Sequence, residues 1–354
     1  ISWGLKSPDI EDLKDLTIWV WTESLWAPIT FTRAALSEDA SNGGSRYSSD
    51  EWRDWWCSDD AAVYQFIGQD NIFFYCIVQN PLWDALDWGL ITDTPVANYH
   101  ILFMNKKASS SGAIKPPMAE ELLEFYTPEQ LRAHWLSLGL DQRAVSFSPK
   151  AFDTSVSRKG KDGQPDLLVK DDPRVVDPAL KESAFLTNIF NRMARSCLYG
   201  AANACGGHLP VSEPHQEVID AAQEVLLKYE QLAYGFDAHS ALAAVDEYAR
   251  AENKRWGEAS KAAQGSDEAY DQALADAFYA LKTITLLMHP AVPEGCERIA
   301  DALNFPHEEF FSWENAFMGP KELAAKLGQS AEEHQLEELP PRFDFFKAHP
   351  SQKN

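Results

Sequence analysis

Two lysines and three serines stand close together in the stretch ILFMNKKASSSGAIKPP, residues 101–117. Its apolar start predicts a strand, and Lys106, Lys107 and Ser109–Ser111 follow directly. Small hydroxyls and backbone N–H groups beside a cation can bind a phosphate. No G-x-x-x-x-G-K-[ST] pattern occurs, so the stretch is not a P-loop. Taken alone it favours a solvated turn, and a linker or a phosphorylation site also fits.

A second candidate is YQFIGQDN, Tyr64–Asn71, where a predicted strand ends at Gly68 and an acid follows at Asp70. A carboxylate in this position can accept a hydrogen bond from a ribose hydroxyl, and glycine lets the backbone approach a ligand closely. The alternative is an ordinary strand-to-helix turn with Asp70 as the N-cap. The stretch by itself favours that alternative.

The second half contains polar residues at a spacing suited to nucleic-acid binding. TNIFNRMAR places Asn188 and Arg192 four residues apart on one helix face, and likewise Asn191 and Arg195. Asn and Arg side chains hydrogen-bond to base edges, and Arg also stacks on bases. Trp256 follows two cations, and an exposed indole there can stack on an unpaired base. The alternatives are a solvated helix face with intrahelical pairs and a core tryptophan, and residue type alone favours them.

The composition argues against several classes of protein. A formal net charge of −23 argues against non-specific nucleic-acid binding through bulk charge, although it leaves room for a local basic patch. The five cysteines form no C-x-x-C pair, which indicates neither a disulfide framework nor a zinc site in this chain. A reduced, cytoplasmic setting fits that cysteine usage. We expect no membrane association, because no signal peptide or long uncharged apolar run is present.

The first half alternates strands and helices, an order typical of an α/β fold. β-branched and aromatic residues predict strands over 16–22, 63–70 and 96–105. Apolar spacing predicts a helix over 71–89, interrupted at Pro81, and two short helices over 117–140, the second opening at Thr127.

Long helical patterns dominate the second half and predict an α-helical bundle. They cover residues 178–204, 214–235, 238–262, 266–289 and 294–303. A chain of 354 residues favours two domains. We expect an α/β domain over 1–156, a polar linker over 157–177, a helical domain over 178–320 and a loosely held tail over 321–354.

The order of these motifs resembles the class I aminoacyl-tRNA synthetases, and most closely the methionyl-tRNA synthetase family. The family's V-W-x-x-A-P-I-G-Y strand is similar to VWTESLWAPITF, with Trp21, Ala27, Pro28 and Ile29, lengthened by two residues. Its H-F-I-G-K-D is similar to QFIGQD, which contains Phe66, Ile67, Gly68 and Asp70. Its mobile K-M-S-K-S loop is similar to Lys107-Ala108-Ser109-Ser110-Ser111. Its G-N-L-V-N-R helix and its P-W pair are similar to Thr187–Arg192 and to Arg255-Trp256.

The resemblance implies a fold: the second half of a Rossmann-like class I nucleotide-binding domain, followed by an α-helical anticodon-binding domain. It also implies a methionine–tRNA ligase, which joins methionine to ATP with Mg²⁺ and passes the methionyl group to tRNA-Met. The implied catalytic residues are Lys107, Ser109, Ser110 and Ser111. The implied ATP and amino-acid site comprises Trp21, Ala27, Pro28, Phe66, Ile67, Gly68, Asp70 and Tyr75. Asn188, Arg192 and Trp256 are the implied anticodon contacts.

The sequence also departs from the family pattern. No His-Ile-Gly-His motif is present and the chain starts at Ile1, so we expect the first half of the catalytic domain to be a missing partner. This chain alone is then expected to be inactive. Ser110 replaces the second lysine of the loop, Tyr75 replaces a histidine, and Gln79 falls near a pocket tryptophan. Two alternatives therefore remain: a non-catalytic synthetase-like tRNA-binding module, and a class I synthetase for another apolar amino acid.

Overall fold

The computed structural model divides into two compact units, Ile1–His100 and Ile101–Asn354. It describes residues 5–18, 20–44, 46–90, 94–107, 115–153, 155–159, 164–172 and 174–352. The division lies well before residue 156, where the sequence placed the end of the first domain. The reason is that the predicted strand over 96–105 is broken into β2 (Thr94–Asn98) and β3 (Ile101–Phe103). β2 pairs with a strand of the first unit, whereas β3 pairs with strands of the second.

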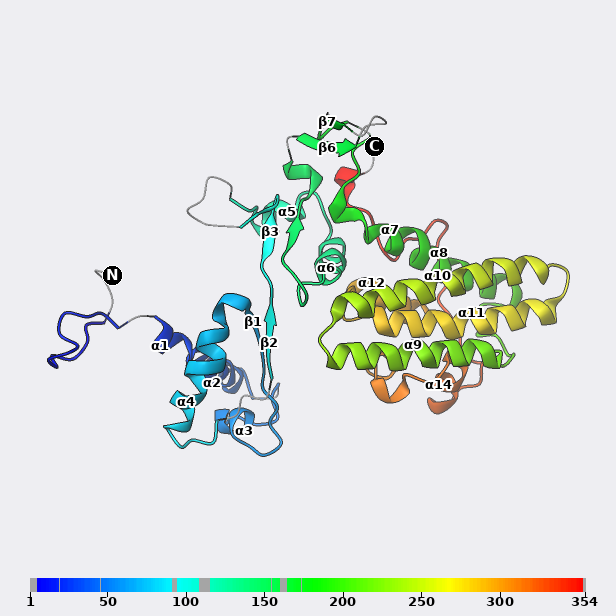
Figure 1. Ribbon diagram of the computed structural model, residues 1–354. Coiled ribbons are helices and arrows are strands. Elements are labelled where there is room, and N and C mark those ends of the chain that lie inside the picture. Colours follow the sequence, from blue (N-terminus) through cyan, green and yellow to red (C-terminus); the bar gives the residue numbers. More distant parts are fainter. Residues whose placement is uncertain are drawn as a thin grey trace. The chain divides into compact units, whose positions relative to one another are not determined.

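The first unit is a parallel strand pair with helices both before the first strand and on the connection between the strands (Figure 1). Its elements are α1 (Trp21–Ser24), α2 (Ala27–Ser41), α3 (Trp52–Trp56), β1 (Tyr64–Gly68), a π-helix (Phe73–Val78), α4 (Gln79–Asp84) and β2. β1 and β2 run parallel, which requires the long helical crossover between them. Ile29, Trp56, Val63 and Trp83 form the core of this unit.

Two predictions about the first unit need correction. The predicted strand over 16–22 is wrong: the chain is already helical at Trp21, and the pairing of Thr17 with Lys6 is an isolated bridge outside the described strands. Strand propensity reflects packing on a sheet, and this segment has no sheet to join. The helix predicted over 71–89 is confirmed from Phe73 to Asp84. It continues through Pro81, just after a change from π-helical to α-helical turns.

The second unit begins with a small mixed sheet and short helices. Its elements are β3, β4 (Lys106–Lys107), α5 (Ala119–Leu123), α6 (Pro128–Leu136), β5 (Val145–Phe147), β6 (Ser155–Lys159) and β7 (Pro165–Val169). β3 runs parallel to β5 and antiparallel to β4. Met104 and Asn105, which connect β3 to β4, both have positive φ, as a tight hairpin turn requires. The predicted start of α6 is confirmed: Thr127 Oγ1 accepts from the Gln130 backbone N–H at 3.2 Å.

The linker predicted over 157–177 is partly wrong. β6 and β7 pair antiparallel in this region, with Val156 opposite Leu168 and Ser155 opposite Val169. Leu168 is 4% exposed, so the hairpin contributes an apolar side chain to the interior. Cross-strand pairing stabilises the hairpin, although the polar composition of the stretch favours a loop.

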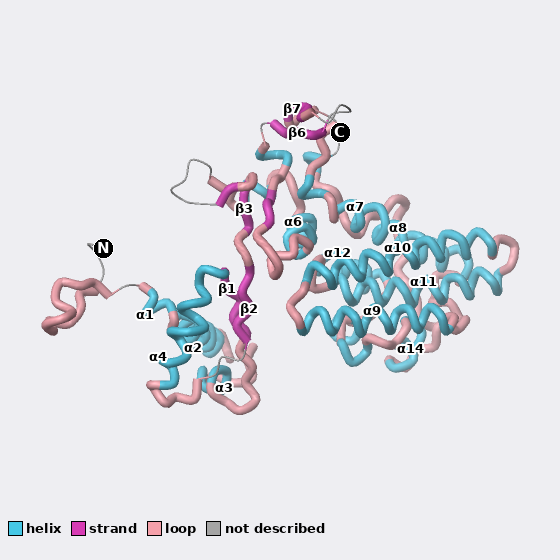
Figure 2. The backbone as a smooth tube through the Cα atoms, in the orientation of Figure 1, coloured by secondary structure: helices cyan, strands magenta, loops and turns pink. Residues whose placement is uncertain are grey.

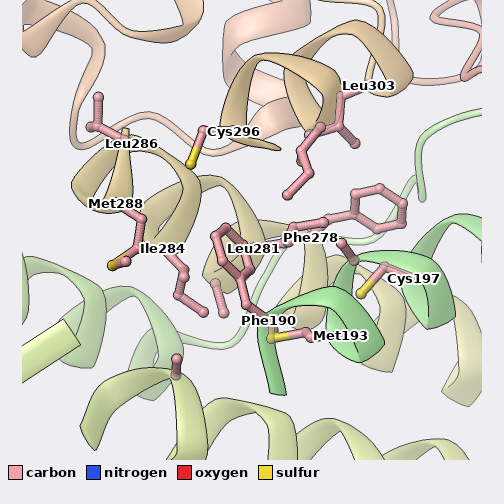
Figure 3. Close-up of a cluster of buried hydrophobic side chains, with 14 of the residues drawn as sticks. Phe190, Met193, Cys197, Phe278, Leu281, Ile284, Leu286, Met288, Cys296 and Leu303 are labelled. Atoms are coloured by element: carbon pink, nitrogen blue, oxygen red, sulfur yellow. The ribbon is translucent and has the colours of Figure 1, made fainter. Parts of the chain in front are cut away.

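The helical half agrees with the sequence pattern to within a few residues. It contains α7 (Ser183–Phe185), a π-helix (Leu186–Phe190), α8 (Asn191–Ala204), α9 (Gln216–Tyr234), α10 (Ala238–Ala262), α11 (Asp267–Met288), α12 (Pro293–Ala302), α13 (His307–Phe310) and α14 (Pro320–Lys326). α9, α10 and α11 lie side by side (Figure 2). Figure 3 shows side chains of α8, α11 and α12 meeting in one apolar cluster, among them Met193, Phe278 and Leu303. None of the described helices is long and apolar enough to cross a membrane.

The loosely held tail predicted over 321–354 is wrong. Phe345 is fully buried and Phe346 is 3% exposed. Asn191 holds the segment: its Nδ2 donates to Asp344 Oδ1 at 2.9 Å and its Oδ1 accepts from the Phe345 N–H at 2.8 Å. A Cβ atom at Gly295 would lie 2.0 Å from the Phe346 ring, so the ring requires glycine there. The tail is therefore part of the bundle core.

Lys282 of α11 gives the bundle a distinctive pH dependence. Its side chain is fully buried, and its Nζ donates to the carbonyls of Asn315 and Ala316. Burial lowers the pKa of this amine from its ordinary 10.5 to about 8. Between those two values the unfolded chain binds more protons than the folded chain, so stability rises with pH across that window.

We therefore predict that wild-type stability rises relative to Lys282→Met between about pH 8 and about pH 10, by roughly 3 kcal/mol at most. Urea unfolding of both proteins at several pH values measures this difference. Lys228→Met, a change at an exposed lysine of α9, is the control and should leave the pH dependence unchanged. If the difference in unfolding free energy between wild type and Lys282→Met stays constant with pH, the prediction is wrong.

Candidate functional site

Four of the predicted ATP and amino-acid residues line one open cavity of about 470 Å³ in the first unit. They are Pro28, Phe66, Ile67 and Tyr75. These residues come from three elements far apart in the sequence: α2, β1 and the π-helix that follows β1. The fold thus gathers residues from separate motifs around one space.

β1 presents the cavity with aromatic side chains because its residues alternate between two faces. Phe66 is 67% exposed, whereas Gln65 is 8% exposed. The strand ends at Gly68 and passes into a 3₁₀ turn, Gln69–Asn71. An added Cβ at Gly68 would lie 2.7 Å from Asp70 Oδ1, so glycine lets the exposed Asp70 carboxylate fold back over the strand end. Asp70 lies inside this turn, whose N-cap position belongs to Gly68.

Trp21 and Tyr75 are joined by aromatic contacts. The Trp21 ring stacks on Phe74, with centroids 3.9 Å apart and planes 5° apart. Tyr75 meets Trp21 edge-on at 6.4 Å. These contacts fix α1 against the π-helix. Ala27 is the first residue of α2, directly before the cavity residue Pro28.

A chain of buried amides lies behind the cavity. Gln65 Nε2 donates to Gln79 Oε1 at 2.9 Å, and Gln79 Nε2 donates to the Leu25 carbonyl at 3.1 Å. Gln79 is fully buried. The two hydrogen bonds connect β1, the start of α4 and the turn between α1 and α2. Gln79, singled out in the sequence only as a departure from a family pattern, is thus a structural link between three elements.

Sequence reasoning missed Trp55 and Trp56 of α3, which also line the cavity. Trp56 Nε1 donates to Thr32 Oγ1 at 2.9 Å, and Thr32 Oγ1 donates to the Pro28 carbonyl at 3.1 Å. The available signal was the run WRDWW, whose tryptophans fall at helical spacing. No chemical motif marks that run, so only the tertiary structure assigns it to the cavity.

The predicted catalytic loop belongs to the second unit. Lys107 is exposed and pairs through its backbone with Leu102 of β3. The turn before it is fixed by the Asn105 backbone N–H, which donates to Ser146 Oγ at 2.8 Å. Ser109, Ser110 and Ser111 lie outside the described residues.

Asn188 and Arg192 are both exposed, whereas Phe190 and Asn191 between them are buried. The two polar side chains therefore lie on the solvent side of the continuous helix formed by the π-helix and α8. The other pair of the same stretch, Asn191 and Arg195, binds the tail: Arg195 Nη1 donates to Asp344 Oδ1 at 2.8 Å.

The expectation that Trp256 is exposed is wrong. Its side chain is 6% exposed, its Nε1 donates to Ser196 Oγ at 2.7 Å, and its ring packs against Tyr270. The faces of the indole are covered, so a base has no surface to stack on, and the core alternative is correct. The neighbouring Arg255 pairs with Glu217 and with Glu252.

No group of three or more His, Cys, Asp or Glu side chains suited to a metal ion occurs in the described part of the chain.

Residues 1–159 match the family model described as tRNA synthetases class I (M). The methionine–tRNA ligase of Methanoculleus marisnigri is 23% identical over 312 residues, which cover 86% of this chain and 40% of that protein. The methionine–tRNA ligase of Methanospirillum hungatei is 24% identical, over 83% of this chain and 39% of that protein. The chain thus spans about two fifths of the length of these relatives.

Solved structures share the fold. Mycobacterium tuberculosis methionyl-tRNA synthetase bound by methionyl-adenylate superposes with a TM-score of 0.64 at 18% identity, over 98% of this chain and 59% of that chain. The free form of the same enzyme gives a TM-score of 0.62 at 16% identity. The chain therefore shares the mixed helical and sheet fold of these two solved structures.

We predict that Gln79→Leu destabilises the first unit by about 1–3 kcal/mol, because it removes two buried hydrogen bonds, one from Gln65 Nε2 and one to the Leu25 carbonyl. Denaturant unfolding followed by tryptophan fluorescence measures the effect, since most tryptophans belong to residues 1–100. Asn80→Leu, at the next and exposed position, is the control and should cost less than about 1 kcal/mol. Equal stability of Gln79→Leu and wild type would show that the amide chain is dispensable.

Proposed function

We propose that this chain, whose residues 1–159 belong to the class I tRNA synthetases, is part of a methionine–tRNA ligase. The observation that carries the proposal is the cavity of the first unit, where Pro28, Phe66, Ile67 and Tyr75 come together from three separate motifs. The relatives named above are methionine–tRNA ligases, which favours methionine over another apolar amino acid.

The reaction has two steps. The methionine carboxylate attacks the α-phosphate of ATP, which forms methionyl-adenylate and releases pyrophosphate. The methionyl group then passes to the 3′ end of tRNA-Met. The half-buried strand end at Gly68 is suited to receive the nucleotide, and the exposed Asp70 carboxylate to accept a hydrogen bond from a ribose hydroxyl or from the methionine ammonium.

Lys107 and the serines 109–111 act on the leaving group. A lysine ammonium and hydroxyl donors placed at the triphosphate stabilise the negative charge that develops as pyrophosphate departs. Mg²⁺ bound to ATP supplies further charge neutralisation at the phosphates. Lys107 stands on a short hairpin whose turn is held by Ser146, so its backbone is fixed at the base of the loop.

The helical half binds the tRNA. Asn188 and Arg192 share the exposed side of one helix and provide hydrogen-bond donors for unpaired anticodon bases. The complete reaction also needs the rest of the catalytic domain, because this chain spans two fifths of its relatives. We place the enzyme in the cytoplasm. A non-catalytic tRNA-binding module is the second candidate, favoured by Ser110 in place of the loop's second lysine.

The first test is tRNA binding. The chain should bind methionine tRNA more tightly than the same tRNA with its CAU anticodon changed, in a filter-binding or fluorescence-anisotropy titration. Arg192→Ala should weaken binding of the unchanged tRNA by about 1–3 kcal/mol, while Lys228→Ala on α9 should have little effect. Equal binding of both tRNAs would remove the anticodon role from the helical half.

The second test concerns amino-acid activation by the whole enzyme. Lys107→Ala should slow ATP–pyrophosphate exchange by about 10²-fold or more while the Kd for methionine changes little. Lys106→Ala is the matched control, because neighbouring strand residues point to opposite faces. Equal exchange rates for Lys107→Ala and wild type would exclude Lys107 from the mechanism. Slowed ATP–pyrophosphate exchange in Lys107→Ala, together with equal binding of both tRNAs, would support the activation role of Lys107 and exclude the anticodon role of the helical half.

A further inference from the structure

A second cavity, of about 240 Å³, lies in the second unit. It is bounded by the end of α6, the segment that leads into α7, and the first half of α10. None of the residues predicted from sequence motifs lines this cavity. It belongs to a different unit from the cavity proposed for amino-acid activation.

The floor of this cavity is apolar. Phe185 of α7, Leu242 of α10 and Met288 at the end of α11 line it. Phe185 is 7% exposed and Met288 is 3% exposed, so both are fixed by the surrounding core. A space of this size and lining fits a branched or thioether side chain of four or five heavy atoms.

The walls of the cavity carry two charges of each sign. Lys181 and Glu182 stand before α7, and Asp246 and Arg250 stand one turn apart on α10. Arg250 Nε donates to both carboxylate oxygens of Asp246, at 2.9 and 3.0 Å. Within the described part of the chain the two terminal amino groups of Arg250 make no hydrogen bond. They remain able to donate to a carboxylate.

A second carboxylate that can accept from a cation also lines the cavity. Glu182 Oε2 contacts His134 Nδ1 at 2.8 Å. Burial acts to raise the pKa of Glu182, but the hydrogen bond and charge of His134 lower it overall, so this carboxylate stays ionised. His239 Nδ1 bonds to the Ser137 carbonyl. A carbonyl only accepts, so Nδ1 carries a hydrogen and the ring is held against α6.

We propose that this cavity binds a free α-amino acid with an apolar side chain. The ligand carboxylate lies at Arg250, its ammonium at Glu182, and its side chain on the apolar floor. A simple anion would meet the carboxylates of Glu182 and Asp246, and a simple cation would meet Arg250 and Lys181. Only a ligand that carries both charges satisfies both walls, and its binding bridges the α6–α7 segment to α10. This inference does not depend on the proposed ligase activity.

Isothermal titration calorimetry of the full chain tests the proposal, with L-leucine as the probe. Leucine avoids confusion with methionine bound at the activation cavity. Two analogues lack one charge each: isopentylamine has no carboxylate and 4-methylpentanoate has no ammonium. We expect leucine to bind and both analogues to bind at least about tenfold more weakly. Absence of leucine binding, or equal binding of either analogue, overturns the proposal.

Substitutions in and beside the cavity test where leucine binds. Arg250→Gln, at a side chain that is 52% exposed, should weaken leucine binding at least about tenfold without affecting folding. Leu242→Trp, which fills the cavity, should abolish it. Lys254→Gln is the matched control: this lysine lies one turn further along α10 and pairs with Glu258. If Arg250→Gln still binds leucine as wild type does, the assignment of the ligand carboxylate to Arg250 is wrong. This result is decisive whether or not Leu242→Trp folds.

Discussion

The buried amide of Gln79 is the constraint on which the first unit depends. One side chain accepts a hydrogen bond from Gln65 and donates one to the Leu25 carbonyl, and no part of it reaches solvent. A buried amide that is hydrogen-bonded at both its oxygen and its nitrogen fixes its partners in register, because a displacement breaks buried hydrogen bonds. The strand that carries Phe66 and the helix that carries Pro28 are therefore held in fixed positions around the cavity.

The helical half is built around α11 in a different way. Its residues from Ala273 to Met288 are buried on nearly every side, so neighbouring elements surround it. Two polar residues organise that packing: Lys282 binds the carbonyls that follow α13, and Asn191 binds the tail that carries Phe345. Both side chains satisfy backbone groups outside regular helices, which explains how irregular segments come to lie against a helical core.

Residues with related proposed roles stand on elements of different character. The residues proposed to bind the nucleotide and the amino acid lie on α1, α2, β1 and the turn and helix that follow β1, whereas Asn188 and Arg192 lie on an exposed helix face of the bundle. Acidic residues dominate the chain as a whole, with a formal net charge of −23. The tRNA recognition proposed for this chain would rely on a few positioned donors, because the net negative charge supplies no bulk attraction to an anionic ligand.

The sequence by itself determined the long helices, the α/β order of the first half and the motifs that resemble a synthetase family. α9, α10 and α11 could be predicted because their apolar residues repeat at helical spacing, a local signal that packing reinforces. The segment at 16–22, the hairpin at 155–169 and the tail around Phe345 were decided by tertiary contacts. In each, the conformation depends on whether a partner strand or a core surface is present, and local residue types do not encode that. The burial of Trp256 and the role of Gln79 have the same cause, since Ser196 and Leu25, their hydrogen-bond partners, lie more than fifty residues away in the chain.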